Sequence, residues 1–182
     1  MDKKQKLGLG VPKNGKKPPS NWHEKLADEL HKPIKRNFTR RRVIVNHIDE
    51  IRCSDLVEIQ QFSKWNKGYR YLLMVLDVFS KYGWIVPFKD KKCETVAKAF
   101  QEIFKGGRKP EYLWADKGKE YYNKHLKDLF QKHDIKLYST ENEEKSFVWE
   151  RWSRTIKTKM GKQFTVQGST QYLDILPEIL NK

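Results

Sequence analysis

The chain has 182 residues, of which 37% are hydrophobic and 13% aromatic, and its formal net charge at pH 7 is +15. This length and apolar content suffice for one domain with a buried core, and they exclude wholesale disorder. No apolar run approaches the roughly 20 residues of a membrane-spanning helix, so we expect no membrane partner. Cys53 and Cys93 have no metal-type spacing and are too few for a disulfide framework, which predicts a reduced, intracellular protein.

The positive charge is concentrated near the N-terminus. Residues 1–45 hold 13 Lys or Arg against 4 Asp or Glu, so this quarter of the chain carries +9 of the total. Such asymmetry predicts a polyanionic partner, and nucleic acid is the commonest one. The alternative is that the charge serves solubility alone.

Residues 1–42 are predicted to form a basic flexible tail and linker. Residues 1–22 mix Lys, Gly and Pro without apolar periodicity. Leu26 and Leu30 predict one short helix that stops before Pro33. The basic cluster KRNFTRRR at 35–42 is typical of a nuclear address or a phosphate-binding arm, and a solvated linker is the alternative.

The folded part is predicted to begin near Val43 with three strands. Residues 51–62 alternate in hydrophobicity, with Ile51, Cys53 and Asp55 on one face. The nearly all-apolar stretch 69–79 indicates a central strand, and Pro87 places the third strand, 84–89, at an edge. Turns at 64–68 and 80–83 make these strands an antiparallel meander.

Strands and helices then alternate. We expect helices at 94–105, 123–134, 147–164 and 170–180, strands at 111–115 and 135–140, and a polar loop at 141–146. Gly106 and Gly107 are expected to end the first of these helices. The order predicts an α/β fold in which a mixed sheet is flanked by helices.

Three carboxylates lie where such a fold places functional sites. Asp55 lies on the first strand, Asp116 ends the fourth, and Glu150 is near the start of a helix. Carboxylate oxygens suit Mg²⁺, and two such ions can serve phosphoryl transfer. By contrast, we expect Asp77 to form a turn, and Glu120 and Asn123 to shape a turn and cap the following helix.

The helix that carries Glu150 is predicted to have two faces. At 100° per residue, Arg154 and Lys157 fall within 40° of Glu150 on a helical wheel. The opposite side holds the apolar residues Trp149, Trp152, Ile156 and Met160. This pattern predicts an apolar face on the sheet and a charged face that could hold phosphates, although a plain solvated face is the alternative.

Four segments in order resemble the catalytic core of retroviral-type DDE integrases. They are CSDLVEI, VLDVFSKYGWIVPFKDK, GRKPEYLWADKGKEYYN and STENEEKSFVWERWSRTIKTKM. More narrowly, they are similar to integrases of Maverick/Polinton DNA transposons and related transposon-derived proteins. The resemblance covers residues 43–182 and implies an RNase H-like fold with a five-stranded mixed sheet. It also implies a metal-binding catalytic triad of Asp55, Asp116 and Glu150, the last two 34 positions apart.

The implied activity is 3′-end processing and strand transfer on DNA with Mg²⁺ or Mn²⁺, through two ions. Lys117, Arg154, Lys157 and Lys159 are the candidate DNA-binding residues. The resemblance further implies DNA and a homo-oligomer as partners, no small-molecule substrate, and a nuclear location. Two alternatives remain open: a DNA-binding remnant that has lost catalysis, and an RNase H-like nuclease that cuts without joining.

The sequence departs from the family at supporting positions. Arg52 replaces a usual Trp, Trp149 a smaller residue such as Val, Ser153 a usual Asn, and Gly161 a usual Trp. A glycine inside a helix costs roughly 1 kcal/mol relative to Ala, so weakened supports around the triad are expected. Relatives also continue beyond the position of Lys182, which is typical of a fragment or of a decaying transposon copy.

Overall fold

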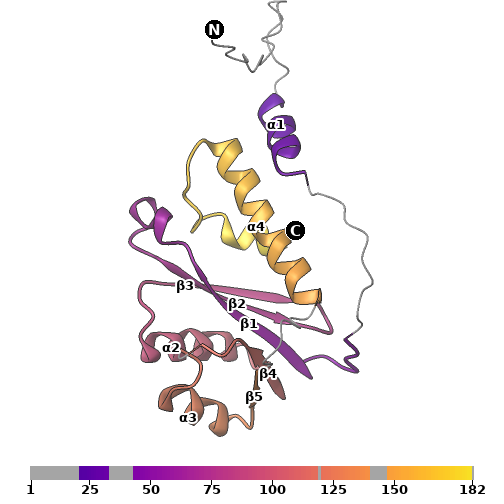
Figure 1. The fold of residues 1–182 in the computed structure, drawn as a ribbon, viewed down its shortest axis with the longest axis vertical. Helices are drawn as coiled ribbons and strands as arrows, with labels where there is room; N and C mark the ends of the chain where they lie inside the picture. Colours follow the sequence, from indigo (N-terminus) through magenta and orange to yellow (C-terminus); the bar gives the residue numbers. More distant parts are fainter. Residues whose placement is uncertain (1–20, 33–42, 119, 140–146, 182) are drawn as a thin grey trace, which may run out of the picture.

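The computed structural model describes residues 21–32, 43–118, 120–139 and 147–181. Five strands form one mixed sheet in the order β3-β2-β1-β4-β5 (Figure 1). The strands are β1 (Ile51–Glu58), β2 (Tyr71–Asp77), β3 (Gly83–Phe88), β4 (Tyr112–Ala115) and β5 (Lys136–Tyr138). The expected α/β, RNase H-like architecture is therefore confirmed, including its mixed sheet.

The first three strands form the predicted antiparallel meander. β3 lies at the edge, where the missing N–H of Pro87 is tolerated. The prediction that 69–79 forms a central strand is confirmed, because β2 lies inside the sheet between β3 and β1. β2 is almost wholly buried, since helices cover both of its faces. The middle position of the sheet belongs to β1, with β4 parallel to it.

The first strand is shorter than predicted. It ends at Glu58, and the 3₁₀ helix η1 (Gln60–Trp65) follows. The N–H of buried Ile59 donates to the Arg70 carbonyl, which closes the ladder and turns the chain away. The turn that follows holds Lys67 and Gly68 at positive φ, as the predicted turn requires.

Helices cover the two faces of the sheet and divide the core in two (Figure 1). One face packs on α2 (Cys93–Phe104) and α3 (Lys124–Lys132). The other face packs on α4 (Phe147–Gln167) and α5 (Leu176–Asn181). No helix among the described residues is long and apolar enough to cross a membrane.

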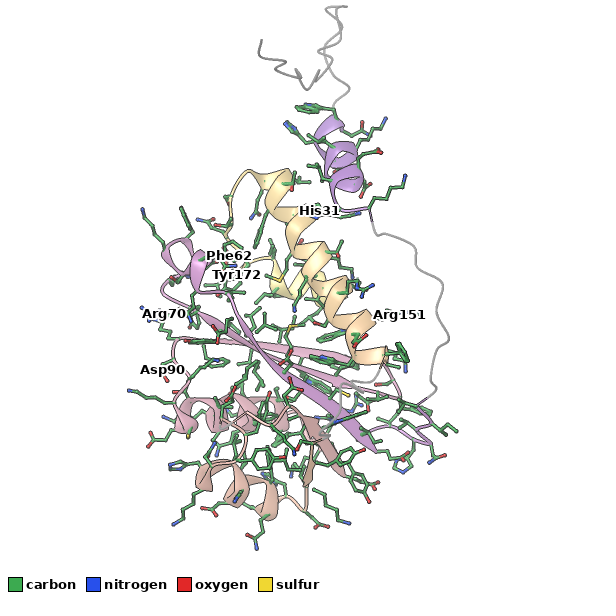
Figure 2. The ribbon with its side chains drawn as sticks, in the orientation of Figure 1. His31, Phe62, Arg70, Asp90, Arg151 and Tyr172 are labelled. Atoms are coloured by element: carbon green, nitrogen blue, oxygen red, sulfur yellow. The ribbon has the colours of Figure 1, made fainter. Side chains whose placement is uncertain are left out.

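The last helix begins later than the sequence pattern suggested. We expected a helix over 170–180, but residues up to Ile175 form a turn and α5 starts at Leu176. The N–H of Tyr172 donates to the side chain of Asn66 at 2.8 Å, so this segment is fastened to the β1–β2 connection. Phe62 and Tyr172 lie close together there (Figure 2).

The short N-terminal helix α1 (Trp22–Leu30) is present as predicted, and it packs on α4. Gly161 allows His31 to approach α4 closely, because a Cβ there would lie 2.9 Å from the His31 ring. Lys162 pairs with Asp28, and His31 contacts the Thr165 hydroxyl. Figure 2 shows His31 beside α4. The rest of the predicted tail, including the basic cluster at 35–42, lies outside the described residues, and the domain boundary at 43 stays a prediction.

Candidate active site

The strand register brings Asp55 and Asp116 to the same place on the sheet. β1 and β4 are parallel, and Ser54 of β1 pairs with Ala115 of β4. Asp55 and Asp116 are the residues that directly follow this pair. Neighbouring strands lie about 4.8 Å apart. Cys53 and Trp114 belong to the core beneath α4, so the alternation of side chains directs Asp55 and position 116 towards α4. Asp55 is half-buried, whereas Asp116 is exposed.

A buried tyrosine, which the sequence analysis did not single out, ties these two strand ends together. Tyr121 follows the Asp116 turn, and its hydroxyl lies 3.0 Å from Ser54 Oγ on β1. Burial raises the pKa of the Tyr121 phenol, and the negative charges of Asp55, Glu120 and Asp116 add to the rise. The phenol therefore stays protonated close to the carboxylates and can act as a hydrogen-bond donor.

The turn between Asp116 and α3 has the predicted chemistry. A Cβ at Gly118 would lie 2.5 Å from the Glu120 carboxyl carbon, so only glycine lets the Glu120 side chain fold over the turn. Asn123 Oδ1 accepts the N–H of Leu126 at 3.0 Å and caps α3. These contacts hold the turn that follows Asp116 against the start of α3.

Glu150 is exposed in the first turn of α4. The helix has the predicted two faces, with Trp149, Ile156 and Met160 buried against the sheet, together with Ser153. The described residues contain no group of three or more His, Cys, Asp or Glu side chains that could hold a metal ion. The structure thus brings Asp55 and Asp116 together, while Glu150 stands on the neighbouring helix, after a predicted polar loop that lies outside the described residues.

The four candidate DNA-binding residues differ in their surroundings. Arg154 and Lys157 are exposed on the same charged side of α4 as Glu150, and Lys117 is exposed beside Asp116. Lys159 is half-buried, and its Nζ donates to the Ile179 carbonyl of α5 at 3.3 Å. Arg154, Lys157 and Lys117 therefore present charge near the carboxylates, whereas Lys159 fastens α5 to α4.

Arg52, the first departure from the family pattern, has partners of its own. Its side chain is fully buried, with the guanidinium 4.1 Å from the Trp84 ring centre. Nη2 of Arg52 donates to Asp49 at 2.7 Å, and Arg108 bridges Asp49 and Asp77. Asp77 also accepts the Ser80 N–H at 2.9 Å, which confirms it as a turn-forming carboxylate. We call these four charged residues, Asp49, Arg52, Asp77 and Arg108, the Arg52 network.

Comparison with solved structures defines the class to which this fold belongs. The chain resembles the catalytic core of HTLV-2 integrase in complex with magnesium (dimeric form), with a TM-score of 0.58 and 18% identity over 72% of this chain and 82% of that one. It also resembles a chain of the simian T-cell lymphotropic virus intasome in complex with PP2A regulatory subunit B56 gamma, with a TM-score of 0.63 and 17% identity over 81% of this chain and 51% of that one. The described domain therefore has the fold of these integrase chains.

The chain also matches curated relatives by sequence. The chain is 36% identical over 124 residues to an uncharacterised transposon-derived protein of Caenorhabditis elegans, a match that covers 68% of this chain and 43% of that protein. It is 30% identical over 116 residues to the Gag-Pol polyprotein of feline leukemia virus, covering 62% of this chain and 7% of that polyprotein. The chain therefore spans less than half of the relatives it matches. No protein-family model matches it.

Proposed function

We propose that this domain carries out metal-dependent DNA strand transfer of the integrase type. The observation that supports this most directly is the register of β1 and β4, which sets Asp55 beside Asp116 in an integrase-core fold. In this reaction water, and then a 3′-hydroxyl, attacks a phosphodiester in line. Membership of the Maverick/Polinton group, a nuclear location and assembly into homo-oligomers are parts of the same proposal.

The donor set at this place fits a divalent cation. Mg²⁺ is held in such sites by one or two carboxylates together with substrate phosphates and waters. Asp55 and Asp116 supply that number of carboxylates from rigid, adjacent strands, and the magnesium complex of the HTLV-2 core has the same fold. We propose that these two residues hold the ion and that Glu150 completes the site from α4. The bound metal would polarise the phosphate and activate the attacking oxygen as a nucleophile.

The chain's own side chains would position the DNA around this centre. Arg154 and Lys157 are exposed one and two turns along α4 from Glu150, so they can contact backbone phosphates beside the reacting one. Lys117 is placed to do the same next to Asp116. Such contacts hold DNA with little regard to its sequence. The buried Tyr121–Ser54 contact would keep the two aspartate-bearing strand ends in register.

A strand-transfer assay tests the proposal. A labelled duplex end, supercoiled plasmid and Mg²⁺ or Mn²⁺ would be incubated with the wild type, Asp55→Asn, Asp116→Asn and Glu150→Gln. Asp128→Asn, an exposed carboxylate on α3, is the matched control. We expect joined product from the wild type and the control only. A role for Glu150 fails if Glu150→Gln joins DNA as well as the wild type does.

The same assay separates the alternatives. Cleavage without joining would indicate an RNase H-like nuclease. DNA binding with neither product would indicate a remnant that keeps its basic surface. Two of the departures from the family pattern give little support to the hypothesis of a remnant that has lost catalysis. Arg52 has charged and aromatic partners, and Gly161 accommodates His31.

A further inference from the structure

A second basic surface lies at the connection between β1 and β2. Residues 59–70 hold three basic residues and no Asp or Glu, and Lys89 adds a fourth directly after β3. We call Lys64, Lys67, Arg70 and Lys89 the η1 patch. All four are exposed, and none of them is among the candidate residues of the active site.

The connection that carries the patch is held in place by buried hydrogen bonds. The N–H of Ile59 donates to the Arg70 carbonyl at 2.8 Å and closes the connection at its base. The side chain of Asn66, which is 1% exposed, donates to the Phe62 carbonyl and accepts the Tyr172 N–H, each at 2.8 Å. The basic side chains therefore project from a fixed backbone, which reduces the entropy that a bound partner must take from them.

Neighbouring carboxylates leave the patch positive. Among the described residues, no Asp or Glu forms an ion pair with any of its four members. Glu58 pairs with Lys91 instead, and Asp90 accepts the Thr95 hydroxyl at 2.8 Å in the first turn of α2. Even when Asp90 and the exposed Asp174, in the turn before α5, are counted in full, four positive charges face two negative ones.

The fold brings like charges together in this patch. β2 and β3 are antiparallel, with Tyr71 opposite Phe88, so the next pair outward is Arg70 and Lys89. The N–H of Arg70 donates to the Phe88 carbonyl at 3.1 Å and continues the ladder to that point. Like charges at opposite positions destabilise a sheet. An anion bound across Arg70 and Lys89 would offset this repulsion.

The patch lies along α4 from the candidate active site. The Phe62 ring of η1 packs on Phe164, with 5.1 Å between ring centres. Glu150 and Phe164 are 14 residues apart on α4, which is about 21 Å along the helix axis. Figure 2 shows Arg70 on one side of the molecule and Arg151, the neighbour of Glu150, on the other. A phosphate every 3.4 Å or so along each strand of B-DNA makes this interval about six base pairs.

We propose that the η1 patch is a second contact surface for the phosphate backbone of the DNA duplex that reacts at the carboxylates. Ammonium groups occupy the nearby ring faces, with Lys64 5.7 Å from the Trp65 ring centre and Lys89 5.2 Å from that of Tyr69. The rings are therefore not open to stacked bases, which favours a duplex over a single strand. That the polyanion is DNA rests on the proposed function.

The salt dependence of DNA binding tests this proposal with the full chain and a labelled duplex of about 20 base pairs. The patch variant is Arg70→Ala with Lys89→Ala. Its control, Lys98→Ala with Lys127→Ala, removes the same charge from exposed positions on α2 and α3. Two lost phosphate contacts lower the slope by about 1.8, so between about 50 and 200 mM salt the wild type should lose about twelve-fold more affinity than the patch variant. The control should keep the wild-type slope.

Two further measurements exclude a loss of structure as the cause. The patch variant should melt at the wild-type temperature or above it, because the change removes two like charges that lie opposite each other. A second variant, Lys64→Gln with Lys67→Asn, should lower the slope by a similar amount. Asn is chosen at position 67 because the backbone there has φ 52°, which Asn tolerates.

The outcomes separate this inference from the proposed function. The inference is overturned if both patch variants keep the wild-type slope while Arg154→Ala with Lys157→Ala lowers it, or if the control falls as far as the patch variants. An equal loss of affinity for a single strand of the same sequence would overturn the assignment to a duplex. Lower slopes for the patch variants in a chain that joins no DNA would sink strand transfer and leave the η1 patch standing.

Discussion

At the scale of single residues, Arg52 shows how a departure from a family pattern is accommodated. A buried guanidinium costs several kcal/mol in lost hydration unless charges and hydrogen bonds replace the water. Asp49 supplies a salt bridge, Trp84 supplies a ring face, and Nη1 alone has no partner among the described residues. Arg52 is three residues from Asp55 on β1, so the network stabilises the strand that carries the candidate ligand.

We predict that Arg52→Ala lowers the free energy of unfolding by about 3 kcal/mol, because it removes a buried charge together with its packing and leaves Asp49 and Asp77 with Arg108 alone. Urea unfolding followed by tryptophan fluorescence measures the change. Arg151→Ala, at an exposed position on α4, serves as the control and should be nearly neutral (Figure 2). A neutral Arg52→Ala would mean that the network contributes nothing to stability.

The pH dependence of stability follows from Asp49. Burial raises the pKa of its carboxyl, but hydrogen bonds and charges from Arg108 and Arg52 outweigh that effect and hold the pKa below its usual 3.8. A carboxyl whose pKa is lowered on folding contributes stability above its unfolded pKa, and that stability is lost as the pH falls through the folded value. We therefore expect the wild type to lose stability below about pH 4.

Urea midpoints measured between pH 2 and pH 6 test this expectation with Asp49→Asn beside the wild type. The variant should be less stable at pH 6 and should fall less steeply on acidification, because it has no carboxyl to protonate at that position. Parallel curves for the two proteins would show that Asp49 is not the group responsible.

At the scale of elements, the approach of α4 to the sheet depends on one glycine. A Cβ at Gly83 of β3 would lie 2.1 Å from Trp152 Cζ2, closer than any van der Waals contact. Trp152 packs into the core beneath α4, two residues after Glu150. The contact between Gly83 and Trp152 thus sets how closely the first turns of α4 approach the meander, and with them the position of Glu150.

We predict that Gly83→Ala costs about 1–3 kcal/mol through overpacking and also lowers strand transfer by displacing the start of α4. A double-mutant cycle with Trp152→Ala separates the clash from other effects. Once the indole is removed, the added methyl group should cost little, so the two changes should be strongly non-additive. Additive losses would place the damage elsewhere than in this contact.

At the scale of the whole molecule, we expect the net charge of +15 to govern how the domain meets DNA, its proposed partner. Each Lys or Arg that contacts a phosphate releases about 0.9 counterion, which the salt dependence of binding measures. We predict that Arg154→Ala and Lys157→Ala each reduce that slope by about 0.9. Lys159→Ala should leave it nearly unchanged, because its ammonium donates to the Ile179 carbonyl.

Fluorescence anisotropy with a labelled duplex, at salt concentrations between about 50 and 300 mM, measures how steeply the binding constant falls with salt. Lys127→Ala, exposed on α3 on the other face of the sheet, is the matched control. Slopes that fall equally for all four variants would indicate binding by diffuse charge rather than through the charged side of α4.

Much of this molecule could be predicted from local patterns. Apolar alternation and runs located all five strands, and the i, i+3, i+4 spacing of apolar residues located the helices. Gly107 has a positive φ just after α2, and Asn123 caps the start of α3, as predicted. The predicted bounds were wrong where contacts between distant residues override local preference. The N–H of Tyr172 donates to Asn66, and the last helix begins later than predicted. The N–H of Ile59 donates to the Arg70 carbonyl, and the first strand ends earlier than predicted.

The sequence by itself determined the order of elements, the two faces of α4 and the three candidate carboxylates, because periodicity and turn chemistry act over a few residues. Only the tertiary structure decided what pairs across the chain. It set Asp55 beside Asp116 through the parallel register, brought Arg108 to the Asp49 carboxylate that Arg52 also binds, and laid α1 on Gly161. These contacts join residues tens of positions apart, and no local pattern encodes them, since they depend on how the elements pack together.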